Sequence, residues 1–372
     1  MEPAIFNDGA LIKMVLEWTS IVMFVIFFAI FTTLFVLKQN VERKALNIDD
    51  AKNYYLNFLH DMGQKSSWDF MPINSVVRRY GFTAAIEEYY NNRPIRDARV
   101  TELISSSDIV AYYQKQAKSR SWAVRSFAYL QLSRLGLPGM KQFFYASADM
   151  EQIKKRSEKA FAICLYSAAL LCDTPEDFKK ILALLQKDQM ISGGFQEGIL
   201  VYAGKTLKSS LGDDKAFTIY QDALHDIPPS EPVMIALVAA AGKLGFRQVE
   251  QLLGYLYEMA GERQAILKVA CLRSFGELKK GRMFVERSLT DADWRVRSTG
   301  ARVAIAFVRD EFIEPLKKCL TDSNYYVRLN AARSLAGMDV EGSVLIQAMN
   351  DTDDLYSKEM SYYALSGLPG HA

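Results

Sequence analysis

Residues 289–297 read LTDADWRVR, and residues 320–328 read LTDSNYYVR. Both phrases carry Leu-Thr-Asp, then an aromatic residue, then Val-Arg. Blocks with small residues early and a larger apolar residue four or five places later begin every 30 residues in this region: ACLRSFGEL (270–278), GARVAIAFV (300–308), NAARSLAGM (330–338) and MSYYALSGL (360–368). A fixed period of this size predicts stacked helical repeats, because one unit cannot bury its apolar face without its neighbours.

The polar residues within each phrase predict the start of a helix. Side-chain oxygens of Asp, Asn or Ser accept the first unpaired N–H groups of a helix. The Val and the small residues that follow recur at helical spacing and form one apolar face. Alanine on that face lets two helices approach closely. An earlier copy at residues 121–125 (SWAVR) has the aromatic residue and Val-Arg without the acidic lead.

These phrases resemble the HEAT repeat, in the short form found in the phycobilin-lyase-like class. The resemblance extends from about residue 265 to the end and partly covers residues 121–136. It implies a structural ladder between adjacent repeats, made by the Asp before a helix and the Arg after the Val, and it assigns those roles to Asp291, Arg297, Asp322 and Arg328, with Arg125 in the earlier copy. The alternative is an arginine stripe for phosphate or carboxylate groups. Residues 355–358 (LYSK) lack Val-Arg, as is typical of a terminal cap.

The whole chain is predicted to be all-α. Breaks such as those at residues 136–139 (GLPG) and 192–194 (SGG) separate helical stretches, and few strand-like alternations lie between them. We expect a short N-terminal segment at residues 1–17, a transmembrane helix at 18–38 and a juxtamembrane helical region at 39–97. A HEAT-like α-solenoid would then occupy residues 98–372, with its clearest repeats at 265–372.

Residues 18–37 (WTSIVMFVIFFAIFTTLFVL) carry no charge. A helix of 20 residues matches a hydrocarbon core of about 30 Å. Trp18 stands where an interfacial aromatic residue belongs. A cleaved signal peptide would need a basic leader, a shorter apolar core and a small-residue cleavage site. We therefore predict a retained membrane anchor.

Four phenylalanines of this stretch share one helix face: Phe24, Phe28, Phe31 and Phe35. They could form a seam for a partner transmembrane helix or a row that faces lipid. Small-residue packing motifs such as GxxxG are absent from the stretch, which favours lipid.

The positive charges around the span predict its orientation. One lysine, Lys13, precedes it, whereas Lys38, Arg43, Lys44 and Lys52 follow it. An excess of Lys and Arg marks the cytoplasmic side. The prediction is a single-pass protein of a bacterial inner membrane, with the N-terminus outside and the solenoid in the cytoplasm.

Signals for catalysis and for bound cofactors are thin. The three histidines are scattered, and no HExxH, phosphate-binding loop or GxSxG motif occurs. The four cysteines show no CxxC and are expected to be buried small hydrophobes. Acidic pairs fall in turns, where helix capping explains them. We assign no catalytic, cofactor-binding or metal-binding residue and expect no enzyme activity.

The function expected from these features is that of a non-catalytic scaffold. The solenoid would bind a membrane protein or membrane-associated enzyme beside the lipid bilayer, as an accessory subunit of an envelope complex for polysaccharide synthesis or secretion. The alternative is a lyase-like enzyme acting on a chromophore, because the short HEAT class includes such lyases. The 45 Lys and Arg against 43 Asp and Glu give no case for nucleic-acid binding, and no small-molecule ligand is expected.

Overall fold

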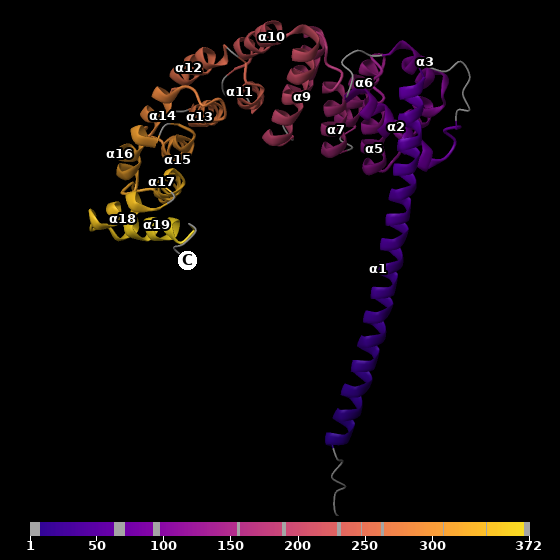
Figure 1. The fold of residues 1–372 in the computed structure, drawn as a ribbon, viewed down its shortest axis with the longest axis horizontal. Coiled ribbons are helices and arrows are strands. Elements are labelled where there is room, and N and C mark those ends of the chain that lie inside the picture. The colour runs from indigo at the N-terminus through magenta and orange to yellow at the C-terminus, as the bar shows by residue number, and fades with distance from the viewer. Residues whose placement is uncertain are drawn as a thin grey trace, which may run out of the picture. The chain divides into compact units, whose positions relative to one another are not determined.

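The computed structural model describes residues 8–62, 71–91, 97–154, 157–187, 191–228, 232–246, 248–261, 264–307, 309–339 and 341–367, without the side chains of 8–21, 24, 25, 309 and 310. Every regular element in these ranges is a helix (Figure 1). The prediction of an all-α chain is therefore confirmed. The chain divides into two compact units, Met1–Gln114 and Lys115–Ala372.

The first unit is built on one long helix, α1 (Asp8–Asp61). Three shorter helices follow it: α2 (Val76–Asn91), α3 (Ala98–Ser106) and α4 (Ile109–Gln116). Helices α1 and α2 pack closely at Gly81, where an added Cβ would lie 2.6 Å from the Ala51 Cβ and 2.8 Å from the Lys52 nitrogen. The buried Tyr55 of α1 donates to the carbonyl of Met71, which precedes α2, at 3.1 Å.

Helix α1 runs without a break through the predicted membrane stretch and into the predicted juxtamembrane region, where it ends at Asp61. Trp18 and Phe24 lie outside the described side chains. Phe28, Phe31 and Phe35 are 58%, 57% and 52% exposed. Within the described residues, no helix has the combined length and hydropathy that a membrane span requires. The membrane anchor accordingly stays a prediction from the sequence.

The second unit alternates between two layers of helices. The helices with odd numbers form the inner layer: α5 (Trp122–Arg134), α7 (Glu158–Ala169), α9 (Gly193–Leu211), α11 (Pro232–Leu244), α13 (Ala265–Leu278), α15 (Trp294–Val303), α17 (Tyr325–Met338) and α19 (Leu355–Leu365). Those with even numbers form the outer layer: α6 (Met140–Ile153), α8 (Pro175–Lys187), α10 (Asp213–Asp226), α12 (Val249–Met259), α14 (Arg282–Ser288), α16 (Arg309–Cys319) and α18 (Ser343–Asn350). A short 3-10 helix, η2 (Ala304–Ala306), extends α15.

Each inner helix packs against the next inner helix, from α5 through α19. Outer helices pack on the inner helices beside them in sequence, and Figure 1 shows α12, α14, α16 and α18 on the outer side of α11, α13, α15 and α17. This is the architecture of an α-solenoid, in which each repeat contacts its neighbours and the array has no central core.

Local capping explains where the last three inner helices begin. Asp293, Asn324 and Asp354 are the N-caps of α15, α17 and α19. Their side-chain oxygens accept from the N–H two residues later, at 2.8, 2.9 and 3.3 Å. The capping predicted from the repeated phrase is confirmed, because it depends only on residues close together in sequence.

Buried hydroxyls fix the register between neighbouring inner helices. Ser274 on α13 donates to the Val238 carbonyl on α11 at 3.0 Å, and Ser334 on α17 donates to the Ala301 carbonyl on α15 at 2.7 Å. Thr206 on α9 makes the same type of bond to the Ala169 carbonyl of α7, at 3.2 Å. Small side chains at these positions are what allow the helices to come so close.

Candidate functional site

The fourth residue of an inner helix recurs as a cation that caps a turn. Nη1 of Arg297 donates to the carbonyls of Asp291 and Ala292 at 2.8 and 3.0 Å. Arg328 makes the equivalent bonds to the carbonyls of Asp322 and Ser323. Arg125 does the same with the carbonyls of Ser119 and Arg120, before α5. Each arginine thereby satisfies the carbonyls of the turn that leads into its own helix.

One arginine also pairs with the next repeat. Arg297 donates through Nε and Nη2 to the two carboxylate oxygens of Asp322, at 2.7 and 2.9 Å. Burial alone would raise the pKa of Asp322, but hydrogen bonds from Arg297 and from the Asn324 N–H hold it below the usual value. The same contact raises the pKa of Arg297. This fork is the geometry in which arginine binds a carboxylate most strongly.

The other ladder residues have different partners. Asp291 pairs with Lys268, the fourth residue of α13, at 2.8 Å. Arg125 pairs instead with Glu151 of α6, through Nε and through Nη2 at 2.8 Å. Arg328 meets no acid in the next repeat: its guanidinium lies 5.1 Å from the Tyr356 ring centre, and its Nε is buried without a hydrogen-bond partner among the described residues.

The missing acid is explained by Thr352. Asp291 and Asp322 each accept the N–H two residues later, at 2.9 and 2.8 Å. Thr352 does this through its hydroxyl, accepting from Asp354 at 3.2 Å. Thr352 therefore stands where the earlier repeats have an aspartate, and it keeps the turn while lacking the carboxylate that would reach Arg328.

Replacing Thr352 by Asp is expected to add a rung to this ladder. The carboxylate would retain the turn and give Arg328 Nε an acceptor, raising the free energy of unfolding by about 1 kcal/mol. Chemical denaturation monitored by circular dichroism measures the change. Thr352→Asn, which keeps an acceptor for the turn without the charge, is the control. Equal stability of the Asp and Asn variants would contradict the assignment.

An open groove lies along the inner layer of the second unit. Its lining comes from the start of α9 and from α11, α13, α15, η2 and α17, and its volume is about 1230 Å³. That exceeds the roughly 300–1,000 Å³ of pockets that bind small molecules. Apolar side chains contribute Ile235, Ala239, Ile266, Val269 and Ile305 to its surface.

Large apolar side chains remain exposed in the groove. Ile266 is 59% exposed and Ile305 47% exposed. Trp294 and Tyr326, which also line it, stack with ring centres 5.6 Å apart and are 40% and 55% exposed. Exposed apolar and aromatic side chains gathered in one groove are typical of a surface that binds another protein.

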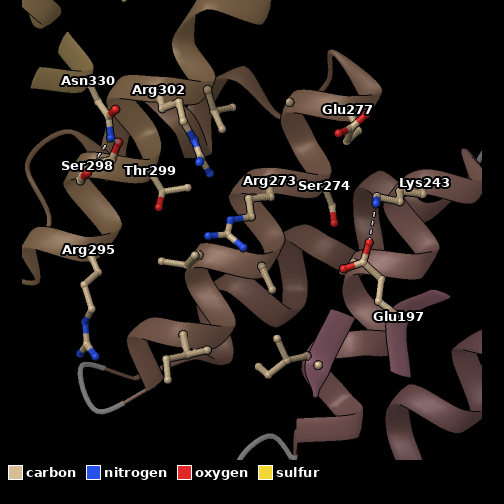
Figure 2. Close-up of a pocket in the computed structure, with 18 of the residues that line it drawn as sticks. Glu197, Lys243, Arg273, Ser274, Glu277, Arg295, Ser298, Thr299, Arg302 and Asn330 are labelled. Atoms are coloured by element: carbon tan, nitrogen blue, oxygen red, sulfur yellow. Dashed lines mark hydrogen bonds and ion pairs between the residues drawn. The ribbon is translucent and has the colours of Figure 1, made fainter. Parts of the chain in front are cut away.

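The charges in the groove are only partly paired. Lys243 pairs with Glu197 at 2.6 Å, and Arg295 pairs with Asp293 at 2.6 Å. Figure 2 shows Arg273 of α13 and Arg302 of α15 reaching into the same space. Within the described part of the chain, neither guanidinium has a carboxylate within ion-pair distance.

The two arginines affect each other electrostatically. Partial burial lowers the pKa of Arg302, and the positive charge of Arg273 lowers it further. Arginine remains protonated at any ordinary pH, so both groups keep their charge. The groove thus holds two neighbouring cations whose mutual repulsion an anion would relieve.

Other groups that could support chemistry are sparse in the described residues. No set of three His, Cys, Asp or Glu side chains is arranged to hold a metal ion there. All four cysteines are buried thiols, as predicted, and burial raises the pKa of Cys319 to about 11. Such thiols are poor nucleophiles.

Comparison with protein families identifies the repeat. Residues 282–366 match the family described as HEAT repeats, which covers α14 through α19. The helices of this segment are therefore similar to HEAT repeats. The match names no subclass, so the phycobilin-lyase-like form stays a prediction. No curated protein that was compared matches the sequence.

Sequence reasoning missed the groove arginines. Arg273 and Arg333 precede Ser at the same place in two of the 30-residue blocks, and Arg302 lies one place earlier in the block between them. That recurrence was a usable signal. Only the folded array shows how these arginines differ. Arg333 contacts the Tyr363 ring, 5.8 Å from its centre, whereas Arg273 and Arg302 line the groove.

Proposed function

We propose that this protein is a non-catalytic scaffold whose HEAT array binds a partner protein in the groove of its inner layer. The observation that carries the proposal is a groove of about 1230 Å³ that combines exposed apolar and aromatic side chains with two arginines for which the described residues supply no ion-pair partner. HEAT arrays characteristically offer long concave surfaces of this kind to other proteins.

We further propose that helix α1 anchors the array to a bacterial inner membrane, with the array on the cytoplasmic side. Apolar side chains from Ile26 to Leu37 are exposed around the helix, which is the distribution expected of a helix in lipid. Thr32 and Thr33 donate to the carbonyls of Phe28 and Ala29, at 2.8 and 2.7 Å. Their hydroxyls need no water, as a lipid environment requires.

The partner that suits this arrangement is a membrane protein or membrane-associated enzyme. An array tethered beside the bilayer meets such proteins at high effective concentration, because both are confined to the same membrane surface. We place the protein, by analogy alone, among accessory subunits of envelope complexes for polysaccharide synthesis or secretion.

Two exposed apolar residues on neighbouring helices test which face binds. Ile266 on the inner helix α13 is 59% exposed, and Met283 on the outer helix α14 is 63% exposed. We expect Ile266→Asp to weaken co-purification of the partner in mild detergent at least tenfold, since it places a charge in the apolar centre of the interface. Met283→Asp is the matched control and should bind as the unaltered protein does.

The same purification tests the anchor. A variant lacking residues 1–38 is expected in the soluble fraction, with its partner largely lost, while the full-length protein stays in alkali-washed membranes. Recovery of the full-length protein without any specific companion, at every detergent and salt concentration tried, would contradict the scaffold. Full-length protein in the soluble fraction would contradict the anchor alone.

A further inference from the structure

The arginines of the second unit differ in whether they form an ion pair with an Asp or Glu side chain. On the outer layer, Arg282 pairs with Glu311 of the next repeat at 2.5 Å, and Arg287 pairs with Glu258 of the preceding repeat. Between inner repeats, Arg297 pairs with Asp322. Arg273 and Arg302 have no such partner in the described residues, although both line the groove.

In these surroundings, Arg273 and Arg302 do not stabilise the fold. Two like charges on adjacent inner helices repel, and partial burial adds to the cost, as the lowered pKa of Arg302 reflects. Neither side chain caps a turn in the way that Arg297 and Arg328 do. An anion held between the two guanidinium groups would remove the repulsion and could accept hydrogen bonds from both planar forks.

We propose that the groove binds an acidic segment of a partner polypeptide, with an Asp or Glu carboxylate held between Arg273 and Arg302. This inference rests on the proposed scaffold function and adds the chemistry of the partner. The apolar surface around Ile266 and Ile305 would receive apolar side chains of the segment, and Trp294 and Tyr326 would contact its backbone and side chains.

A polypeptide fits the groove better than a polyanion. Glu277 lies one turn after Arg273 on α13, and Glu197 lies across the groove, paired with Lys243. These carboxylates would repel a continuous row of phosphates, whereas an isolated carboxylate at the arginine pair avoids them. Base stacking and phosphate contacts along a nucleic acid also require a longer stripe of cations than Arg273, Arg302 and Lys279 supply.

A binding assay on the full-length protein in detergent tests this inference. The probe is a fluorescein-labelled peptide of alternating glutamate and leucine, followed by fluorescence anisotropy at low and high salt. We expect it to bind, and the double variant Arg273→Gln/Arg302→Gln to bind it at least tenfold more weakly, because the hydrogen bonds to a charged acceptor are lost. The Gln/Leu version of the peptide should bind the unaltered protein equally weakly.

Controls separate this site from general attraction. Lys187 and Lys318 are exposed on the outer helices α8 and α16, and Lys187→Gln/Lys318→Gln removes the same charge without touching the groove. That variant should retain full affinity. Arg273→Lys/Arg302→Lys keeps both charges without the planar forks and should lose part of the affinity. All three double variants change exposed side chains, so their unfolding midpoints should stay close to that of the unaltered protein.

Several outcomes would overturn the inference: no binding of the Glu/Leu peptide at low salt, equal binding by the Arg273→Gln/Arg302→Gln variant, or tighter binding of an oligothymidylate than of the peptide. Co-purification of the partner distinguishes a failure of the acidic-segment inference from a failure of the scaffold proposal. If the partner co-purifies equally with the Arg273→Gln/Arg302→Gln variant, the scaffold stands and the acidic-segment inference falls. If the peptide binds through the arginines but no chain co-purifies with the unaltered protein, the scaffold falls.

Discussion

Replacing Glu151 by alanine is expected to lower the free energy of unfolding of the second unit by about 3–5 kcal/mol. Arg125 and Glu151 are each only 2% exposed, and the carboxylate accepts from Nε and Nη2 of Arg125 and from the Tyr129 hydroxyl. Without Glu151, the guanidinium of Arg125 would remain buried with two backbone carbonyls as its acceptors. A buried charge without its counter-charge is among the costliest changes a folded chain can undergo.

Chemical denaturation of the full-length protein in detergent, followed by tryptophan fluorescence, measures this effect. Glu151→Gln keeps the shape of the side chain and one acceptor, so its free energy of unfolding should fall less than that of Glu151→Ala. The double variant Arg125→Met/Glu151→Met removes both charges and should recover much of the loss, because well-packed apolar side chains often replace a buried ion pair without penalty. A change below about 0.5 kcal/mol in Glu151→Ala would show that the pair contributes little.

Substituting Gly242 by alanine is expected to destabilise the array by about 1–3 kcal/mol. An added Cβ would lie 2.5 Å from the Ser274 Cβ and 2.8 Å from the Ser274 Cα. The second of these contacts involves the main chain of α13, so no side-chain rotation can relieve it. Helices α11 and α13 would have to separate, which would also weaken the hydrogen bond from Ser274 to Val238.

Gly198 provides the matched control for that substitution. It lies within α9 and would place a Cβ in open space. Gly198→Ala should therefore stabilise the helix by about 0.5–1 kcal/mol, the usual gain from replacing glycine in a helix. The unfolding midpoints of the two variants should move in opposite directions. If Gly242→Ala also stabilises the protein, the close approach of α11 and α13 is wrong.

The parts of this fold that the sequence predicts are those set by neighbouring residues and by the period. Asp293 and Asn324 cap the helices that follow them because a cap involves residues two positions apart. The period of 30 residues in the blocks at 270, 300, 330 and 360 predicts that inner helices pack against one another. Both follow from local chemistry repeated along the chain.

Contacts made across irregular segments could not be predicted. The resemblance placed Asp291 in a ladder, but its partner Lys268 belongs to a repeat whose lead phrase is unlike the others. Glu151, the partner of Arg125, lies near the end of α6, where no repeated pattern marks it. The groove is likewise formed by several helices together. That Arg273 and Arg302 lie near each other follows only once α13 and α15 pack side by side.

A structure of the co-purified complex, determined by electron cryo-microscopy in detergent, tests the scaffold proposal most directly. The account predicts that partner residues occupy the groove along α11, α13 and α15, with contacts at Ile266 and Trp294. A partner bound only to outer helices such as α12, α14 and α16, with the groove left open to solvent, would contradict it.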